Sequence, residues 1–477
     1  MTMRPAIVML MLAALSAAAA FYVTRHSTDI SERVRLQQRL PTVDSISVDR
    51  VTVITLRRHG EPELQFSRDG GGSAGWVQTA PIRHPVDQFS ISQLIELAKA
   101  LTVLQQIDED DLRNGLSPAA LGFDPPKCIL KYESPAGSHT LEFGRRGIGG
   151  RGYIRIAGRL EIYAVPQDLH ERAIAHDPRE WRDRTLFPGL DPDIHRIEML
   201  SSDRSISLSR GSRSGHEPVP LTPHPDGRGS GGHQGRWMLD SPVKTRAEVE
   251  AVEQLLSAMT RARHSGFVMD NPEDLSRFGL SPPAGSFSFS FSIDDSTPEA
   301  PPVRLLIGSR IGLNSEDRFG MVEGRDTVVR LSAPVLAALF PQLDKLIAAT
   351  ASGMNPADVK TLFISGPEHE FRLQRDLERW VAPDQENAPV PARQVEELLN
   401  LLTTVRAPQV IIKEFPLDEQ IGFVTFHGFD ARPKDSVRIA RDAQTGQWLL
   451  ENGDGVIRVF PGSVKLPLSP QDFGLSP

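Results

Sequence analysis

The chain has 477 residues, enough for about two to four domains that each bury a core. Hydrophobic residues make up 39% of it and charged residues 24%, as in an ordinary globular protein. With a formal net charge of -8, we expect no nucleic-acid partner, because such binders concentrate basic surface. The single cysteine, Cys128, excludes an internal disulfide and a cysteine-rich zinc site. It lies in a strand-like run and is expected to be a small buried side chain.

The first residues of the chain predict a membrane segment. Residues 5–23 form an uncharged run after Arg4, close to the roughly 20 residues that a helix needs to span a bilayer core. A cleaved signal peptide, with small residues at 16–20 as its cut region, is the alternative. We favour a retained anchor, because the run exceeds the usual signal core of roughly 7–15 residues. Both interpretations place the bulk of the chain outside the cytoplasm, in the periplasm, with residues 28–45 as a juxtamembrane spacer.

The first of three similar modules is predicted over residues 46–190. Strand-like runs separated by Gly and Pro indicate antiparallel hairpins. Between them, Trp76 and Pro81 precede a helix that is expected over residues 87–104, because apolar residues recur there every three or four positions. These apolar positions are Ile91, Leu94, Ile95, Ala98 and Leu101.

The second module, residues 191–350, repeats the same order. Trp237 and Pro242 again precede an amphipathic helix. Thr245 and Glu248 have the spacing of a capping box, in which each side chain satisfies a free backbone N–H of the first helical turn. The apolar face of this helix is expected at Val249, Val252, Leu256 and Met259.

Two further stretches of the second module have a clear composition. Residues 211–235 are rich in Gly, Ser, Pro, His and Arg, and we expect a disordered insertion because they cannot bury enough apolar surface to fold. Residues 287–293 alternate apolar and polar side chains with a period of two. This alternation predicts a strand with one buried and one wet face.

The third module, residues 355–477, is shorter and is expected to lack the closing helix. Trp380 and Pro389 precede its helix, and residues 428–433 resemble a Gly-Phe-Asp-Pro motif of the first module. The repeats have the size of domains, far longer than the roughly 20–50 residues of solenoid units. The predicted fold class is therefore α+β. It consists of tandem repeats of an antiparallel sheet with one long amphipathic helix packed on it, preceded by one N-terminal transmembrane helix.

Two glycine patterns match catalytic or cofactor motifs by letter only. Residues 147–152 fit G-x-G-x-x-G, but a strand follows where the dinucleotide motif needs a helix, so we expect a hairpin loop. Arg145, Arg146 and Arg151 would suit an anion there, although solvated arginines are commoner. Residues 71–75 fit G-x-S-x-G, but they belong to a hairpin loop and not to a nucleophile elbow.

Histidines and acidic residues form no recognisable site in the sequence. None of the histidines in or near the insertion has the spacing of a helical metal pair. They are His195, His216, His224, His233 and His264. His369 has no partner histidine, and the acidic run at 108–111 lacks the ligand pattern of a calcium loop. No catalytic, cofactor-binding or metal-binding residue is therefore predicted, and no cofactor.

The repeated motifs resemble a bacterial family of membrane-anchored envelope proteins known as a domain of unknown function. The motifs are the tryptophan-to-proline turns, the proline-rich segments after the helix, and the strands that end in Gly. They lie at 76–81 and 237–242, at 121–126 and 278–283, and at 141–144 and 305–308. The resemblance covers residues 51–347 well and the third module loosely. It implies genes beside ABC-transporter components of the gliding-motility auxiliary type, and it implies no catalytic residues.

We therefore expect a non-enzymatic, membrane-anchored extracytoplasmic protein that serves as an accessory or scaffold of a transport or envelope complex. Its expected partners are the membrane, through the N-terminal helix, and ABC-transporter or other envelope proteins. An exported binding module for a glycan or peptide is the first alternative. An envelope hydrolase is disfavoured, because the sequence assembles no catalytic constellation.

Overall fold

The computed structural model describes residues 16, 40, 50–68, 75–107, 116–175, 177–190, 193–211, 237–291, 301–366, 368–377 and 379–476. Two compact units divide the chain, Met1–Arg184 and Thr185–Pro477. Apart from single positions, the predicted anchor at 5–23, the spacer at 28–45 and the insertion at 211–235 lie outside the described residues. Among the described helices, none is long and apolar enough to cross a membrane.

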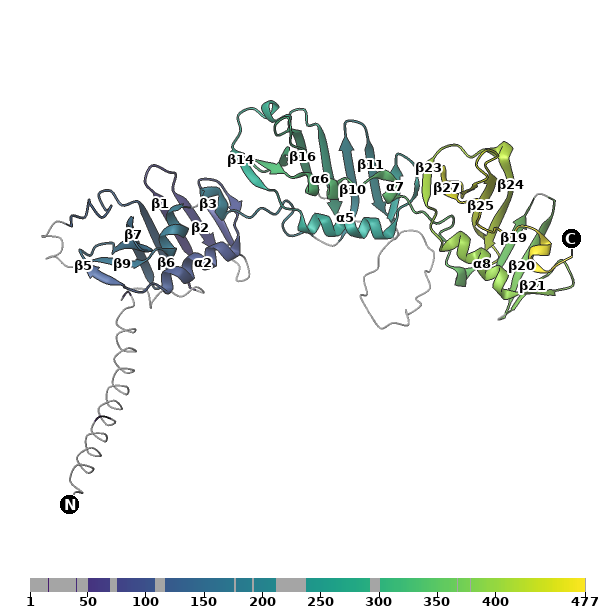
Figure 1. Cartoon of the computed structure of the whole chain (residues 1–477), viewed down its shortest axis with the longest axis horizontal. Helices are drawn as coiled ribbons and strands as arrows, with labels where there is room; N and C mark the ends of the chain where they lie inside the picture. The colour runs from purple at the N-terminus through teal and green to yellow at the C-terminus, as the bar shows by residue number, and fades with distance from the viewer. Residues whose placement is uncertain are drawn as a thin grey trace, which may run out of the picture. The chain divides into compact units, whose positions relative to one another are not determined.

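Three antiparallel sheets of nine strands each follow one another along the chain, one in the first unit and two in the second (Figure 1). In each sheet, two four-stranded meanders meet at their first strands, and the ninth strand lies at the edge of the second meander. A long helix follows the first meander and carries the chain to that edge. The prediction of tandem repeats built on antiparallel sheets is confirmed.

The first sheet has the strand order β4-β3-β2-β1-β6-β7-β8-β9-β5. Its strands are β1 (Val53–Arg58), β2 (Leu64–Arg68), β3 (Trp76–Ala80), β4 (His84–Pro85), β5 (Gln105–Ile107), β6 (Cys128–Ser134), β7 (Gly137–Gly147), β8 (Arg151–Ile156) and β9 (Ile162–Pro166). The helices are α2 (Gln88–Lys99), α4 (Asp168–His170), η2 (Glu171–Ala175) and η3 (Pro178–Trp181).

The second sheet repeats this order as β13-β12-β11-β10-β15-β16-β17-β18-β14. Its strands are β10 (Ile194–Ser201), β11 (Ser205–Arg210), β12 (Trp237–Ser241), β13 (Thr245–Arg246), β14 (Gly266–Asp270), β15 (Gly285–Phe291), β16 (Val303–Arg310), β17 (Arg318–Val322) and β18 (Thr327–Leu331). The helices are α5 (Val249–Arg261), η4 (Ser276–Phe278), α6 (Ala333–Leu339) and α7 (Leu343–Leu346).

The third sheet has the order β22-β21-β20-β19-β24-β25-β26-β27-β23 and is as complete as the other two. Its strands are β19 (Thr361–Ser365), β20 (Glu370–Asp376), β21 (Arg379–Ala382), β22 (Ala388–Val390), β23 (Gln409–Ile412), β24 (Gln420–His427), β25 (Pro433–Arg441), β26 (Trp448–Glu451) and β27 (Val456–Phe460). The helices are η5 (Pro356–Asp358), α8 (Ala392–Thr403), η6 (Leu417–Glu419) and η7 (Pro470–Phe473). The short η7 stands after the last strand, where the second module has α6.

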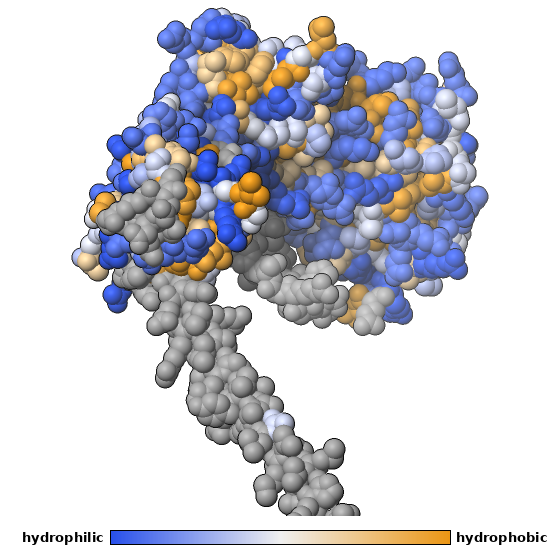
Figure 2. All heavy atoms as spheres, turned by 60° about the vertical axis from the view of Figure 1, so that its left-hand side comes forward, coloured by the Kyte–Doolittle hydropathy of each residue, from blue (hydrophilic) through white to orange (hydrophobic). Residues whose placement is uncertain are grey.

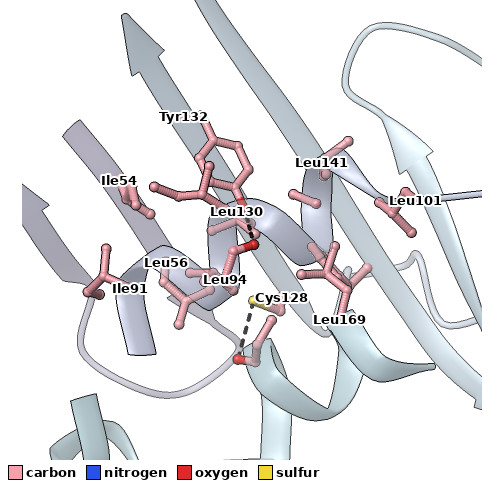
Figure 3. Close-up of a cluster of buried hydrophobic side chains, with 14 of the residues drawn as sticks. Ile54, Leu56, Ile91, Leu94, Leu101, Cys128, Leu130, Tyr132, Leu141 and Leu169 are labelled. Atoms are coloured by element: carbon pink, nitrogen blue, oxygen red, sulfur yellow. Dashed lines mark hydrogen bonds between the residues drawn. The ribbon is translucent and has the colours of Figure 1, made fainter. Parts of the chain in front are cut away.

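Helix α2 packs on the first sheet as its periodicity predicts. Ile91, Leu94, Ile95 and Ala98 are buried in one core with the inward side chains of the central strands. Figure 3 shows Ile91 and Leu94 beside Leu56 and Leu130 of that core. The Tyr132 hydroxyl donates a hydrogen bond of 3.3 Å to the carbonyl of Leu94, which ties β6 to the helix. The helix ends at Lys99, earlier than predicted, because residues 105–107 pair with β9 as the edge strand β5.

The capping box predicted at Thr245 and Glu248 is not formed at the start of α5. The helix begins at Val249, and its N-cap residue, Glu248, makes no side-chain capping bond. Thr245 belongs to the edge strand β13 instead, and its hydroxyl bonds to Asp454 of the third module. Val249, as the first helical residue, is 54% exposed. The fully buried positions of the face are Val252, Leu255 and Met259, while Leu256 is only partly buried.

The segment 278–283 packs against β16 at Gly308, a position that has no room for a side chain. A Cβ atom at Gly308 would lie 2.1 Å from the carbonyl oxygen of Phe278. In the first module, a Cβ atom at Gly144 would lie 2.3 Å from the carbonyl oxygen of Leu121. The two repeated motifs are thus one contact. Both strands continue beyond this glycine, β16 to Arg310 and β7 to Gly147, so the prediction that they end there is wrong. The glycine lies within the strand, where the missing side chain lets the proline-rich segment lie across it.

The prediction that residues 428–433 repeat the motif of the first module is wrong. These residues lie between β24 and β25, so they follow the first strand of the second meander, whereas the motif precedes that strand in the other modules. The topological counterpart of 278–283 is the segment that holds η6, because both precede that strand. The two stretches share letters because Gly and Pro mark hairpin turns in general.

The repeated tryptophans are core residues. Trp76, Trp237 and Trp380 lie at or near the start of β3, β12 and β21, and no more than 8% of each is exposed. An arginine of the neighbouring strand lies over each ring, with its guanidinium carbon 5.1–5.8 Å from the ring centroid. These arginines are Arg68, Arg210 and Arg375, each the cross-strand partner of its tryptophan.

A buried polar network joins the second module to the third. Arg458 has no exposed surface, and its guanidinium donates to both carboxylate oxygens of Asp454, at 2.9 and 2.7 Å. Its Nε atom donates to the carbonyl of Ala348, in the segment between α7 and η5, at 3.2 Å. Asp454 also accepts the bond from Thr245, and the nearby Val456 packs in the core of the second module. The two modules of the second unit therefore share buried structure.

Candidate functional site: a serine-lined groove

The second sheet has one face covered by α5 and another that is covered at one end only. On the helix face, Val252 and Met259 pack in one core with Phe287. On the opposite face, Phe278 and Leu280 pack with outward side chains of β16, β17 and β18. Over β10, β11 and β15, the cluster of Phe278 and Leu280 does not extend across this opposite face, and the strands' own side chains form the surface described below.

Serines occupy the open face on both sides of the central strand β10. Their apolar neighbours on β11 and β15 face the core, and the serines alternate with them and face outward. The serines are Ser205, Ser207 and Ser209 on β11, and Ser286, Ser288 and Ser290 on β15. The strand register places Glu198 of β10 directly between Ser207 and Ser288.

Small side chains leave a hollow on this face, which we call the serine groove. It has a volume of about 550 Å³, within the range of about 300–1,000 Å³ that is common for ligand sites. Its walls include Arg196, Glu198 and Leu200 from β10, with Pro283 from the covering segment. A smaller hollow of about 280 Å³ shares Arg196, Glu198 and Ser288 and reaches Pro301 and Pro302. The two hollows therefore lie next to each other on this face, and we include both in the serine groove.

The charged side chains of the groove form ion pairs and are partly exposed to solvent. Arg196 and Glu198 form an ion pair of 2.8 Å in which 47% of each side chain is exposed. Arg304 lies at one end and pairs with Glu323 at 3.5 Å. Exposed pairs of this kind contribute about 0–1 kcal/mol to stability. The groove therefore carries both positive and negative side chains, and because each is already paired, a ligand needs no net charge to bind there.

One hydroxyl in the groove has no partner among the described residues. Ser207 is only 9% exposed, and its Oγ atom is buried without a hydrogen bond to any of them. A buried hydroxyl without a partner costs about 1–3 kcal/mol. A ligand that hydrogen-bonds to Ser207 would recover this cost.

The other two sheets carry larger side chains at the same place. The register position of Ser207 is held by Gln65 in the first sheet and by Arg372 in the third. The position of Ser288 is held by Lys131 and Thr425. Gln65, Lys131 and Arg372 are longer than serine, so the small side chains that shape the groove are a feature of the second module.

The glycine-rich loop at 147–152 is a hairpin, as its context indicates, and its last glycine serves packing. A Cβ atom at Gly152 would lie 2.3 Å from the ring of His170. That ring is buried edge-on against Phe143 and bonds to the carbonyl of Tyr153 at 2.9 Å. Burial lowers the pKa of His170 to about 4. The final glycine of the pattern therefore makes room for a neutral histidine.

The arginines of that hairpin do not form a closed anion site. Arg146 pairs with Glu171 at 3.5 Å, and more than 40% of each of these side chains is exposed. Arg145 uses its backbone N–H to bond to the carbonyl of Leu121. The hairpin is thus held by backbone contacts, and Arg146 already has a carboxylate partner.

The remaining sequence candidates lie apart from one another. Cys128 is buried in the first core, as predicted, and burial raises the pKa of its thiol to about 12. His369 faces Glu368 at 3.9 Å. Within the described ranges, no three potential metal-ligating side chains gather. The acidic run at 108–111 and the histidines at 216, 224 and 233 lie outside the described residues.

Sequence reasoning did not select the groove, although part of its signal was visible. The alternation in 287–293 indicates a wet face, and residues 205–209 alternate in the same way. The alternation alone does not predict that β11 and β15 lie on either side of the same strand, β10.

In the view of Figure 2, hydrophobic residues form small separate groups in a mostly hydrophilic surface, so no large apolar patch marks a site on the described part of that face.

Comparison with known proteins gives the family. A family model described as "Domain of unknown function (DUF4340)" matches residues 76–226 and 237–420. No curated protein and no solved structure matches the chain. The matched stretches cover more than half of the sequence and include the repeated tryptophans at 76, 237 and 380. The chain therefore belongs to the DUF4340 family, a family of unknown function.

Proposed function

We propose that this protein is a non-enzymatic scaffold or accessory subunit of a transport or envelope complex. In this proposal, residues 5–23 anchor it in the cell membrane and the modules lie outside the cytoplasm. Its partners are ABC-transporter or other envelope proteins, as the family resemblance implies.

The observation that carries the proposal is the junction between the second and third modules. Arg458, Asp454 and Thr245 form a network that buries charge between two otherwise complete sheets. Removing charge from water is costly, and such a contact persists only where its geometry satisfies each group. A scaffold needs modules with a fixed mutual arrangement, and this network supplies that constraint.

Affinity purification from solubilised membranes tests the scaffold role. A tagged full-length chain is expected to recover transporter subunits in stoichiometric amounts. Repeated purification without any co-purifying subunit would contradict it. The anchor is tested separately by washing membranes with alkaline carbonate, where release of the chain into the soluble fraction would rule out a spanning segment.

An exported binding module for a glycan or peptide is the second candidate, and the serine groove favours it. Arrays of glycans and of peptides probed with the purified chain test it, and a flat response on both would retire it. A hydrolase stays disfavoured. The described side chains that line the groove include no histidine, cysteine or lysine beside the serines, so no familiar nucleophile and base pair is assembled there.

A further inference from the structure

We propose that the serine groove of the second module binds an extended, net-neutral peptide segment of a partner protein. The proposal rests on the scaffold function and specifies the chemistry of one contact. It depends on the dimensions of the groove, on its hydrogen-bonding groups and on the position of its apolar end.

The groove has the length of a short extended peptide. Its lining comes from five adjacent strands, β12, β11, β10, β15 and β16. At about 4.8 Å between neighbouring strands, they span about 19 Å. An extended chain covers this distance with about six residues, because each contributes about 3.3 Å.

The hydrogen-bonding groups of the groove suit a peptide backbone. A serine hydroxyl donates one hydrogen bond and accepts others, so it can serve both N–H and C=O groups. Ser207 supplies a buried hydroxyl without a partner among the described residues, and Ser288 lies across Glu198 from it at 5% exposure. An extended segment presents alternating N–H and C=O groups to such a surface.

The apolar end and the paired charges of the groove further restrict which peptide segments can bind. Leu200 is 51% exposed and lines the groove with Leu306, which provides a place for one apolar side chain. Arg196 is paired with Glu198 and Arg304 with Glu323, so each charge of the lining already has a partner and the groove favours a segment without net charge. A glycan is less suited, because sugars stack on exposed aromatic rings, and the only ring among the described lining residues, Phe289, is 2% exposed.

A displayed library of random peptides of about ten residues, selected on the full chain in detergent, tests the proposal. We expect enriched peptides that carry one apolar residue among neutral ones. Ser288→Trp fills the groove and should weaken the enriched peptides at least about tenfold. Ser209→Trp is the matched control. It stands on the same face of β11 but outside the groove lining, and it should leave their affinity unchanged.

A second variant guards against misfolding of the tryptophan substitution. Ser207→Ala removes the unpartnered hydroxyl without adding volume, and it should weaken the peptides about threefold, as loss of one neutral hydrogen bond would. Circular dichroism checks that each variant keeps its sheet content. Equal binding by wild type, Ser207→Ala and Ser288→Trp would overturn the proposal.

Two other outcomes also overturn it. A library without enriched sequences would leave the groove without a peptide ligand. Polysaccharide binding on a glycan array that Ser288→Trp abolishes would assign the groove to a carbohydrate instead. If transporter subunits co-purify with Ser288→Trp while peptide binding is absent from the wild type, the scaffold function stands and the groove assignment fails. Peptide binding without any co-purifying complex would support the groove assignment and contradict the scaffold function.

Discussion

Thr245 donates a hydrogen bond to Asp454, although 209 residues separate them in the chain. The bond joins the edge strand of the second sheet to the turn before β27 in the third. Asp454 receives two further bonds from Arg458, which is fully buried. Thr245 has the spacing of a helix cap in the sequence, but in the folded chain it belongs to the contact between modules.

Asp454→Ala should destabilise the second unit strongly. The substitution leaves the guanidinium of Arg458 buried without its carboxylate, and breaking such a pair costs about 3–5 kcal/mol. The measurement is urea unfolding of the full chain followed by tryptophan fluorescence, where a lower midpoint is expected. Glu397→Ala is the control, because its pair with Arg393 is exposed, and it should not move the midpoint. Similar midpoints for both variants would contradict the importance of the network.

The first unit should lose stability as the pH falls from about 6.5 towards 4. Burial lowers the pKa of His170 to about 4, so between these values the unfolded chain binds a proton that the folded chain does not. Stability therefore rises with pH in this window, and the full effect is on the order of 3 kcal/mol. The measurement is the unfolding midpoint of wild type and His170→Gln at pH 7 and pH 5. A wild type and a variant with the same pH dependence would refute this role of His170.

Gly308→Ala should destabilise the second module by about 1–3 kcal/mol, the usual cost of overpacking. The new methyl group would lie 2.1 Å from the carbonyl oxygen of Phe278, so the segment 278–283 has to move. Thermal unfolding of the full chain measures the effect. Gly266→Ala is the matched control, since a Cβ atom there meets nothing within 4 Å. If Gly308→Ala unfolded at the wild-type temperature, the claim that Gly308 has no room for a side chain would be wrong.

Cys128 should resist alkylation as long as the first unit is folded. Burial raises the pKa of the thiol to about 12, and the thiolate is the reactive form. Iodoacetamide at pH 8 is expected to label the chain only at the rate of unfolding, and rapidly in guanidinium. Mass spectrometry counts the adducts. Fast labelling under native conditions would mean that the core around α2 opens readily.

The sequence by itself determined the features that depend on local spacing. The apolar period of three and four residues located α2 and its buried side, because a helix repeats every 3.6 residues. Gly and Pro located the hairpins, and the repeated tryptophans revealed the tandem modules, because packing of the same kind selects the same residues. The anchor at 5–23 rests on the same kind of local argument and remains a prediction.

Only the tertiary structure decided the features that depend on which strands become neighbours. Strand order arises from distant pairings, and it places β11 and β15 on opposite sides of β10. That order turns two separate runs of serines into one groove around Glu198. It also takes Thr245 away from the helix and gives it to Asp454. The local spacing of apolar residues predicts which face of a strand is exposed to solvent. Which strands become its neighbours is determined by the burial of the whole sheet.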